Sequence, residues 1–461
     1  MISIDSKKRF NLYTSSKIGM ERIIVVGGGV AGVSAALGAR KQNEKIEIII
    51  IEKEKYTGYL RGKLPYIISG EISYDKVIPR IDFLKEKRIQ VFLSSIVNKV
   101  DLNGKKITFM NSEKHERTID FSKIVFAIGS IPLTLNVRGR NLDRIYELRT
   151  IEDAIKINKE VMKNVRVVIV GGGLVAVKTA ESLLKRGCKI VMVFPEPEIL
   201  YKVFDDNIGK VFREKMEKRG VEVIHKNKVK AFYGTKSVEA ADTEKGVISC
   251  DMVILALGSK PNTVLAKEAG IPLGQYDGII VDERMETLKK GVYAAGDCAE
   301  YTNFITKEKE PIHLAALAFQ SGEVAGRNAA GGSERMGKII ENISAKIFGT
   351  EILSVGITLR EAKNFRIKVL SSYLVLEKND CYKPKLKTHI NLMFDSESRK
   401  LIGAQMIGKG AMAWSNFLTL SIIKEVTVEE IAYFCYSHSP KVDEIRAEVI
   451  AAAKRAKDLF G

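Results

Sequence analysis

Cysteine is scarce in this chain, and its placement excludes several kinds of chemistry. The five cysteines among 461 residues are Cys188, Cys250, Cys298, Cys381 and Cys435. No pair has the short C-x-x-C spacing of a zinc ligand set or a redox motif, so the sequence predicts no disulfide framework and no metal site. No cysteine precedes Cys188, so the first 187 residues offer no thiol.

Long apolar runs are also missing. None approaches the roughly 20 residues that a membrane-spanning helix needs, so we expect no membrane span. Residues 1–20 lack the apolar core of a secretory signal and are interpreted as a short N-terminal extension. A cytoplasmic protein is therefore expected.

Acidic residues are outnumbered, since 74 Lys and Arg stand against 56 Asp and Glu and leave a net charge of +18. This excess is either a well-solvated surface or a surface for an acidic partner, such as a small electron carrier or an anionic substrate. The basic stretches 213–230 and 383–387 do not interleave aromatic residues as a base-stacking platform would. Nucleic acid is therefore the least favoured partner.

A glycine-rich loop follows the first apolar run, residues 23–26, and predicts a dinucleotide site. Gly27 allows a tight turn, Gly29 lets the backbone approach a pyrophosphate, and Gly32 lets the next helix pack closely on its strand. That helix starts at Val30 and Ala31, so its positive end faces the phosphates. Glu52, with Lys53 beside it, ends the second strand twenty residues past Gly32, where a carboxylate binds a ribose. The alternative is a βαβ unit without a cofactor.

A second loop of the same kind follows residues 167–170. Gly171 and Gly173 are present, Leu174 and Val175 open the helix, and Ala176 replaces the third glycine. Phe194 stands where an NAD-selective site would carry an acid, which weakens discrimination against a 2′-phosphate. The neighbouring cations Lys185, Arg186 and Lys189 could favour NADPH, and the choice between NADH and NADPH stays open. The alternative is that this half has lost nucleotide binding.

Three later strands end in small residues that suit a flavin site. The first carries Ala127 and Gly129, the second Gly258, and the third Gly296 and Asp297. A helix over 315–330 follows, and Leu314 and Ala315 at its start could direct backbone amides at a flavin ring. From residue 336 the pattern changes to alternating strands, such as 368–370 and 389–394, with helices expected at 411–424 and 443–459. This region is interpreted as a separate α+β domain.

Together these motifs resemble the pyridine nucleotide-disulfide oxidoreductase family, in the branch of NADH oxidases and coenzyme A-disulfide reductases. The resemblance covers residues 23 to about 453. It implies an α/β fold with two Rossmann-like dinucleotide-binding domains, as in glutathione reductase, plus a C-terminal α+β dimerisation domain. The expected ranges are 1–20 for the extension, 21–149 and 271–335 for the FAD domain, 150–270 for the NAD(P) domain and 336–461 for dimerisation. It also implies FAD and NAD(P)H as cofactors and a homodimer.

One departure from that branch matters for the chemistry. Relatives carry a single redox cysteine two residues before Leu-Pro-Tyr. Here Leu64, Pro65 and Tyr66 are present, but the cysteine position is Gly62. A flavin–thiolate relay, a sulfenic-acid cycle and disulfide exchange with coenzyme A all require that sulfur.

Three further side chains are candidates around the flavin, and a fourth, Lys178, is a second departure from the relatives. Arg61, also a cofactor-binding candidate, and Lys63 resemble the basic residues that rubredoxin- and ferredoxin-type reductases place here. They would stabilise reduced flavin or receive an acidic carrier, or else be solvated or bind a cofactor phosphate. Lys178 falls where relatives usually show Glu near the nicotinamide. His438, in a stretch that relatives bring to the partner subunit's flavin, is either an acid–base group or a structural residue.

The sequence therefore favours an FAD-dependent NAD(P)H oxidoreductase without a redox thiol. Electrons would pass directly from reduced flavin to oxygen, a quinone or dye, or a small acidic carrier. One alternative is a redox-gated FAD- and NAD-binding protein that acts through its basic surface. Another is a diverged coenzyme A-disulfide reductase. A membrane-linked sulfide or quinone flavoprotein lacks both the cysteine pair and an amphipathic anchor.

Overall fold

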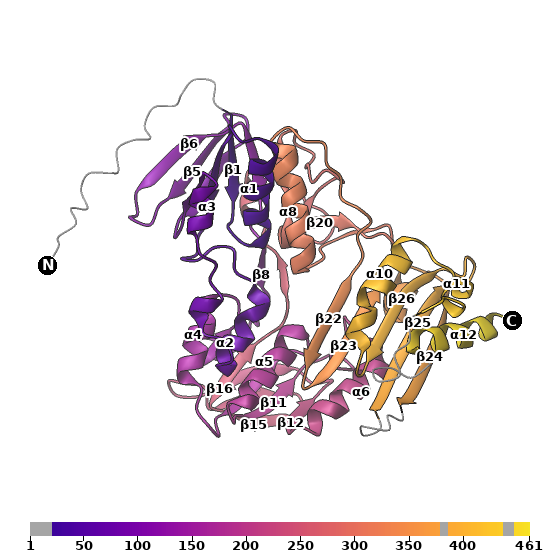
Figure 1. Ribbon diagram of the computed structural model, residues 1–461. Coiled ribbons are helices and arrows are strands. Elements are labelled where there is room, and N and C mark those ends of the chain that lie inside the picture. Colours follow the sequence, from indigo (N-terminus) through magenta and orange to yellow (C-terminus); the bar gives the residue numbers. More distant parts are fainter. Residues whose placement is uncertain (1–20, 379–385, 437–446) are drawn as a thin grey trace.

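A five-stranded parallel sheet forms the first unit of the molecule (Figure 1). The computed structural model describes residues 21–378, 386–436 and 447–461. The sheet order is β19-β7-β1-β2-β3, so the chain enters at the centre and returns to one edge much later. The strands are β1 (Arg22–Val26), β2 (Glu47–Ile51), β3 (Ile89–Phe92), β7 (Lys123–Phe126) and β19 (Val292–Ala294).

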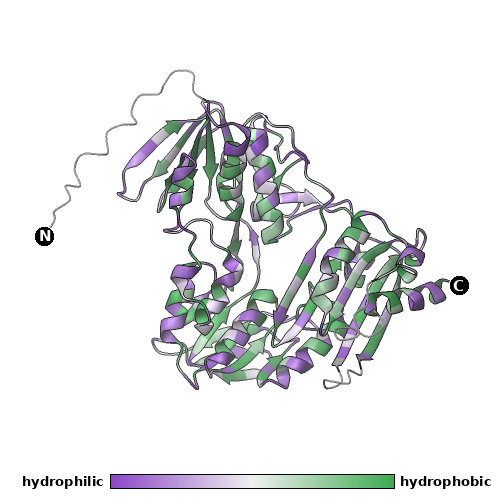
Figure 2. Cartoon of the chain, in the orientation of Figure 1, coloured by the Kyte–Doolittle hydropathy of each residue, from purple (hydrophilic) through white to green (hydrophobic). Residues whose placement is uncertain are grey.

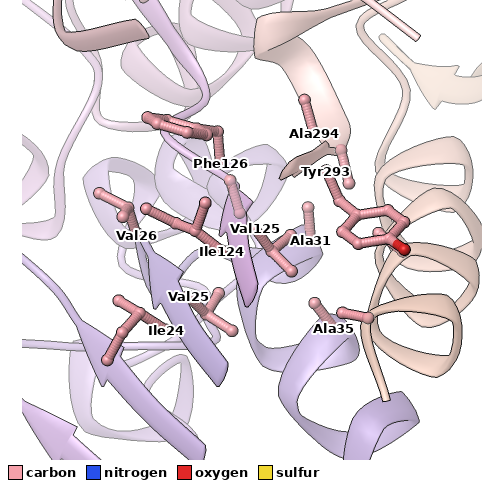
Figure 3. Close-up of a cluster of buried hydrophobic side chains, with 14 of the residues drawn as sticks. Ile24, Val25, Val26, Ala31, Ala35, Ile124, Val125, Phe126, Tyr293 and Ala294 are labelled. Atoms are coloured by element: carbon pink, nitrogen blue, oxygen red, sulfur yellow. The ribbon is translucent and has the colours of Figure 1, made fainter. Parts of the chain in front are cut away.

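Continuous β-branched runs explain why these strands lie inside. Residues 23–26 and 48–51 are buried, as expected of parallel strands that are covered on both faces. Helices α1 (Val30–Gln42) and α8 (Ala315–Ala329) pack beside them. Figure 3 shows Val25, Val125 and Tyr293 from three strands gathered near Ala31 and Ala35 of α1.

The helices α1 and α8 approach so closely that only glycine fits between them. A Cβ on Gly322 would lie 2.3 Å from the Ala31 carbonyl oxygen, and one on Gly326 would lie 1.8 Å from that of Ala35. Small residues along both helices therefore hold α8, 285 residues later in the chain, against the first nucleotide loop.

A second unit repeats this plan. Its parallel sheet has the order β12-β11-β10-β16-β9, and each unit also carries a three-stranded antiparallel sheet, β4-β5-β6 in the first and β13-β14-β15 in the second. Helix α5 (Leu174–Lys185) follows β10 as α1 follows β1. The strands of the parallel sheet are β9 (Ile145–Glu147), β10 (Arg166–Val170), β11 (Lys189–Val193), β12 (Val221–Ile224) and β16 (Met252–Leu255). The antiparallel strands are β4 (Ile96–Asp101), β5 (Lys106–Met110), β6 (Glu116–Asp120), β13 (Val229–Tyr233), β14 (Ala240–Thr243) and β15 (Gly246–Ser249).

Two short strands join the units. Strand β8 (Ser130–Pro132) leaves the first unit and pairs antiparallel with β17 (Ser259–Pro261), which returns from the second. In Figure 1, β8 lies between the upper and lower parts of the molecule. The chain therefore passes between the two units at this pair of antiparallel strands. The other elements of these two units are helices α2 (Leu64–Ser69), α3 (Asp82–Glu86), α4 (Ile151–Glu160), α6 (Asp206–Glu217) and α7 (Val264–Glu268), and strands β18 (Ile279–Ile280), β20 (Ala299–Thr302) and β21 (Lys309–Glu310).

The C-terminal part is an antiparallel sheet with helices, as the alternating pattern predicts. Its order is β22-β23-β26-β25-β24. The helix expected at 411–424 is the short turn Ala411–Trp414 followed by α10 (Ser415–Ile423), and the one expected at 443–459 is α12 (Glu448–Phe460), with residues 443–446 outside the described part. The remaining elements are β22 (Asn342–Ile347), β23 (Thr350–Gly356), α9 (Leu359–Asn364), β24 (Val369–Lys378), β25 (Leu386–Asp395), β26 (Leu401–Ile407) and α11 (Val428–Ala432).

Apolar residues concentrate along the central strands of the sheets, whereas polar residues colour the outer helix turns and the hairpin tips (Figure 2). Across the described residues, no helix combines the length and the apolar character that crossing a membrane would require.

Candidate flavin and nicotinamide site

The first glycine-rich loop forms an open backbone surface at the start of α1. Gly27 adopts φ +98°, and a Cβ there would lie 2.3 Å from the Ala127 carbonyl oxygen. A Cβ on Gly32 would lie 1.9 Å from the Gly27 carbonyl oxygen. A Cβ on Gly29 would meet nothing within 4 Å. Two glycines are therefore required by the protein itself, whereas Gly29 faces free space at the positive end of the helix, next to Val30 and Ala31.

Glu52 lies beside this loop, at the end of β2. Its side chain is buried, and its two oxygens accept hydrogen bonds from the backbone amides of Gly28 (2.5 Å) and Glu54 (2.7 Å). Burial raises the pKa of this carboxyl, while the two amides oppose the shift. A carboxylate fixed in this way is oriented to accept a ribose hydroxyl at the loop. Lys53 next to it is exposed to solvent.

Asp297 is brought to the same loop from the far end of the unit. It lies in the turn Gly296–Cys298, where Gly296 adopts φ +75° and a Cβ would lie 2.8 Å from the Ala31 Cβ. The Ser130 hydroxyl, one residue after Gly129, donates to Asp297 Oδ2 at 2.9 Å, and Arg149 donates to the same hydroxyl at 2.9 Å. The carboxylate is therefore held between the first loop and the crossing strands.

The start of α8 lies near this group. Leu314 is the residue before the helix, Ala315 is its first residue, and no side chain caps it. Ala315 is exposed, so the free backbone amides of the first turn are open to a ligand. Such amides favour negative charge, which is the property predicted for this helix start beside a reduced flavin ring.

The second loop has the same geometry with different side chains. Gly171 adopts φ +126° and approaches the Ala256 carbonyl oxygen, and Gly173 faces free space before Leu174 and Val175. Phe194 follows β11 as Glu52 follows β2, and a Cβ on Gly172 would lie 3.0 Å from its ring. An apolar ring therefore replaces the ribose-binding carboxylate. Gly258 lies past this loop, where its carbonyl accepts from the Leu133 amide at 2.9 Å.

The expected role of Lys185, Arg186 and Lys189 in favouring NADPH is wrong. Lys185 ends α5 and Lys189 starts β11, so all three lie at the end of the unit opposite Gly171. A helix of twelve residues is about 18 Å long, which is too far for these side chains to meet a 2′-phosphate. Lys185 instead pairs with Glu71 (2.7 Å), and Arg186 donates to the Ile68 carbonyl (3.2 Å).

Arg61 and Lys63 turn out to be unlike one another. The Arg61 guanidinium pairs with Glu54 (2.7 Å) and donates to the Tyr59 hydroxyl (3.1 Å) and the Arg149 carbonyl (2.5 Å). Protein groups therefore occupy most of its hydrogen-bonding capacity. Lys63 is exposed, and Gly62 between them has no atom within 4 Å of a Cβ position. Of these two cations, Lys63 is the more accessible.

Three of the four described cysteines are buried inside the protein. Cys188, Cys250 and Cys298 are buried, and burial raises the pKa of the Cys298 thiol to about 11. The expectation that Cys298 is a packed side chain is confirmed. Cys435 is exposed, and His438 lies outside the described residues.

Three contributors were missed at the sequence level. Glu54 and Arg149 hold Arg61, and Ser130 holds Asp297. Ser130 lies in the small-residue stretch that ends the strand before it, but its partner Asp297 is 167 residues away, so no local pattern could have identified the contact.

Comparison with known proteins places this geometry in a family. Residues 21–322 match the pyridine nucleotide-disulphide oxidoreductase family, and residues 343–449 match its dimerisation domain. The chain belongs to this family. It is 31% identical to an NADH oxidase of Methanocaldococcus jannaschii over 94% of this chain and 98% of the relative. It is 26% identical to an NAD(P)H coenzyme A polysulfide/persulfide reductase of Pyrococcus horikoshii over 95% of this chain and 98% of that relative.

The solved structures agree. An NAD-dependent persulfide reductase of A. fulgidus superimposes with a TM-score of 0.90 at 25% identity, covering 95% of this chain and 83% of that one. The expected fold is therefore confirmed, and so is an NAD(P)H-dependent flavoprotein oxidoreductase with FAD and NAD(P)H as cofactors. The open backbone at Gly29 and the fixed Glu52 carboxylate fit an adenine dinucleotide at the first loop.

Proposed function

We propose that this oxidoreductase passes electrons from reduced flavin directly to an acceptor, without a redox-active thiol. The observation that carries the proposal is Gly62, which stands at the cysteine position of relatives, is exposed, and has empty space where a side chain would be. No cysteine lies in the first 187 residues, and three of the later ones are buried. Buried thiols with raised pKa values are poor nucleophiles and poor electron relays.

In this proposal each part of the site has a defined task. The Gly29 backbone and the α1 N-terminus bind the FAD pyrophosphate, Glu52 orients the adenosine ribose, and Asp297 binds the ribitol side. Ala127, Gly129, Gly296 and the first turn of α8 line the rest of the cofactor. When bound, FAD supplies hydride acceptance from NAD(P)H and electron transfer to the acceptor. Gly171, Gly173, Leu174 and Val175 bind the NAD(P)H pyrophosphate at the start of α5.

A homodimer in the cytoplasm is part of the same proposal. Its support is the match of residues 343–449 to the family's dimerisation domain. For a protein acceptor the structure favours Lys63 over Arg61 as the docking cation, because Arg61 is paired with Glu54. Lys63→Glu should then weaken reduction of an acidic carrier and leave dye reduction intact. Equal loss of both activities would contradict docking at Lys63.

The alternatives make different predictions. A diverged coenzyme A persulfide reductase, suggested by the name of the Pyrococcus horikoshii relative, would need a thiol and would lose activity on alkylation. A redox-gated binding protein would turn over slowly with every acceptor and bind polyanions in a salt-sensitive way.

The experiment is an acceptor screen with NADH before and after treatment of the holoenzyme with N-ethylmaleimide. Oxygen, a quinone, a dye, a small acidic iron–sulfur protein and coenzyme A persulfide would be compared. We expect turnover with at least one of the first four that alkylation changes less than twofold. Turnover that is confined to the persulfide and abolished by alkylation would overturn the proposal.

A further inference from the structure

Lys178 lies on α5, close to the second nucleotide loop. The helix starts at Leu174, directly after Gly173, so Lys178 is one turn along, about 6 Å from the helix start. Residues 178, 181 and 185 share one face of the helix. That face contacts the first unit, because the Lys185 ammonium pairs with Glu71 at 2.7 Å.

Helix α2 is the part of the first unit that packs on α5. The two helices pack together, and their C-terminal ends meet where Arg186 donates to the Ile68 carbonyl at 3.2 Å. Helix α2 has six residues and is about 9 Å long. Its start, preceded by Gly62, therefore lies nearer the loop end of α5, at about the level of Lys178.

The Lys178 side chain is partly buried on α5. Burial lowers its pKa, and Glu181 is the charged neighbour that opposes this. The Glu181 carboxylate already accepts the Phe348 amide at 2.9 Å and lies 3.7 Å from Lys185. Within the described part of the chain, no ion pair joins Lys178 to an acid. Phe194, which follows β11 beside the loop, is an apolar residue and adds no negative charge there.

A nicotinamide nucleotide bound at the second loop would lie close to the Lys178 ammonium. Its pyrophosphate is expected at Gly173, and hydride transfer requires its nicotinamide to reach the first unit, where the flavin lies. The face of α5 that meets the first unit carries Lys178. The reduced nicotinamide ring is neutral and the oxidised ring carries one positive charge. Like charges repel, so a nearby ammonium weakens binding of the oxidised form alone.

We propose that Lys178 is a positioning residue that makes this site bind the reduced nucleotide in preference to the oxidised one. The inference rests on the proposed binding of NAD(P)H at the second loop. Its consequence is fast release of the spent nucleotide and weak product inhibition. Removing the charge should tighten binding of NAD⁺ about tenfold, which equals about 1.4 kcal/mol.

The test measures affinities on the oxidised holoenzyme by calorimetry at pH 7, with three probes. NAD⁺ carries the charged nicotinamide ring, tetrahydro-NADH carries a neutral nicotinamide-derived ring that donates no hydride, and ADP-ribose has no nicotinamide ring. The variants are Lys178→Met, Lys178→Arg and, as the matched control, Lys189→Met at the opposite end of β11. Lys189 is exposed and remote from the loop.

We expect Lys178→Met to tighten NAD⁺ about tenfold while tetrahydro-NADH and ADP-ribose change less than twofold. Lys178→Arg and Lys189→Met should leave the ratio of NAD⁺ to tetrahydro-NADH affinities unchanged. Equal shifts for NAD⁺ and tetrahydro-NADH, or no shift for either, would overturn the role of Lys178. Failure of the wild-type protein to bind ADP-ribose would instead refute nucleotide binding at the second loop.

Discussion

Replacing Gly29 by alanine separates what the first loop does for the fold from what it does for the cofactor. Gly29 has φ −69° and ψ −168°, which alanine adopts without strain, and its Cβ would meet no protein atom within 4 Å. The free energy of unfolding of the apoprotein should therefore change by less than about 0.5 kcal/mol.

The cofactor should respond differently. If the FAD pyrophosphate lies against Gly29, the added methyl group occupies its space. Overpacking by one methyl group typically costs about 1–3 kcal/mol, which corresponds to a rise in the FAD dissociation constant of roughly 5- to 150-fold. The assay is flavin titration of apoprotein by fluorescence quenching, beside urea unfolding of the same sample.

Gly32→Ala is the contrasting variant. Its Cβ would lie 1.9 Å from the Gly27 carbonyl oxygen, so α1 must shift by about 1.5 Å to restore a normal carbon–oxygen contact. That variant should lose stability as well as FAD. If Gly29→Ala binds FAD as tightly as the wild type, the cofactor does not pass over this loop and the assignment of the first site is refuted.

Three further predictions follow from single contacts. Gly173→Ala, whose Cβ also meets free space, should weaken ADP-ribose binding in calorimetry at least fivefold and leave the unfolding midpoint unchanged. Arg61→Met should lower the urea-derived stability by about 2 kcal/mol because it leaves the buried Glu54 carboxylate without its cation, and an unchanged stability would refute that role. Burial, with Glu361 and Glu310 nearby, raises the pKa of Glu341 to about 7, so its native form binds a proton that the unfolded form loses near pH 4.5. The contribution of Glu341 to the free energy of unfolding therefore falls as pH rises from about 4.5 through 7. Glutamine does not titrate, so the change in unfolding free energy caused by Glu341→Gln should be more stabilising at pH 8 than at pH 5 by about 2 kcal/mol, measured by urea unfolding.

Features set by local sequence were predictable. Both glycine-rich loops, the strands before them and the position of Glu52 follow from short-range rules, because a buried parallel strand, a tight turn and a helix start each need particular residues in order. The alternation of apolar and polar residues after residue 336 predicts antiparallel strands, and the strands of the C-terminal sheet pair antiparallel in the structure.

Features set by distant contacts were not predictable. Strand β9 has only three residues, yet it pairs with β16 and completes the second sheet, more than a hundred residues later. The sequence does not show a partner for Arg61, but in the structure its guanidinium pairs with Glu54 and donates to the Arg149 carbonyl. Lys185 and Lys189 lie near the loop in sequence and at the opposite end of the unit in space, since the helix carries the chain away from the loop.

The central claim, electron transfer without a thiol, is tested most directly by anaerobic titration of the holoenzyme with NADH and separately with NADPH. The flavin absorbance and the long-wavelength region are followed together. The account predicts full bleaching by one equivalent of the preferred nucleotide per flavin, with no long-wavelength thiolate-to-flavin charge-transfer band at any point. The contrary result is a charge-transfer band that appears during the titration and is absent after alkylation, together with consumption of two equivalents of nucleotide per flavin. That result would show a redox-active cysteine and contradict the account.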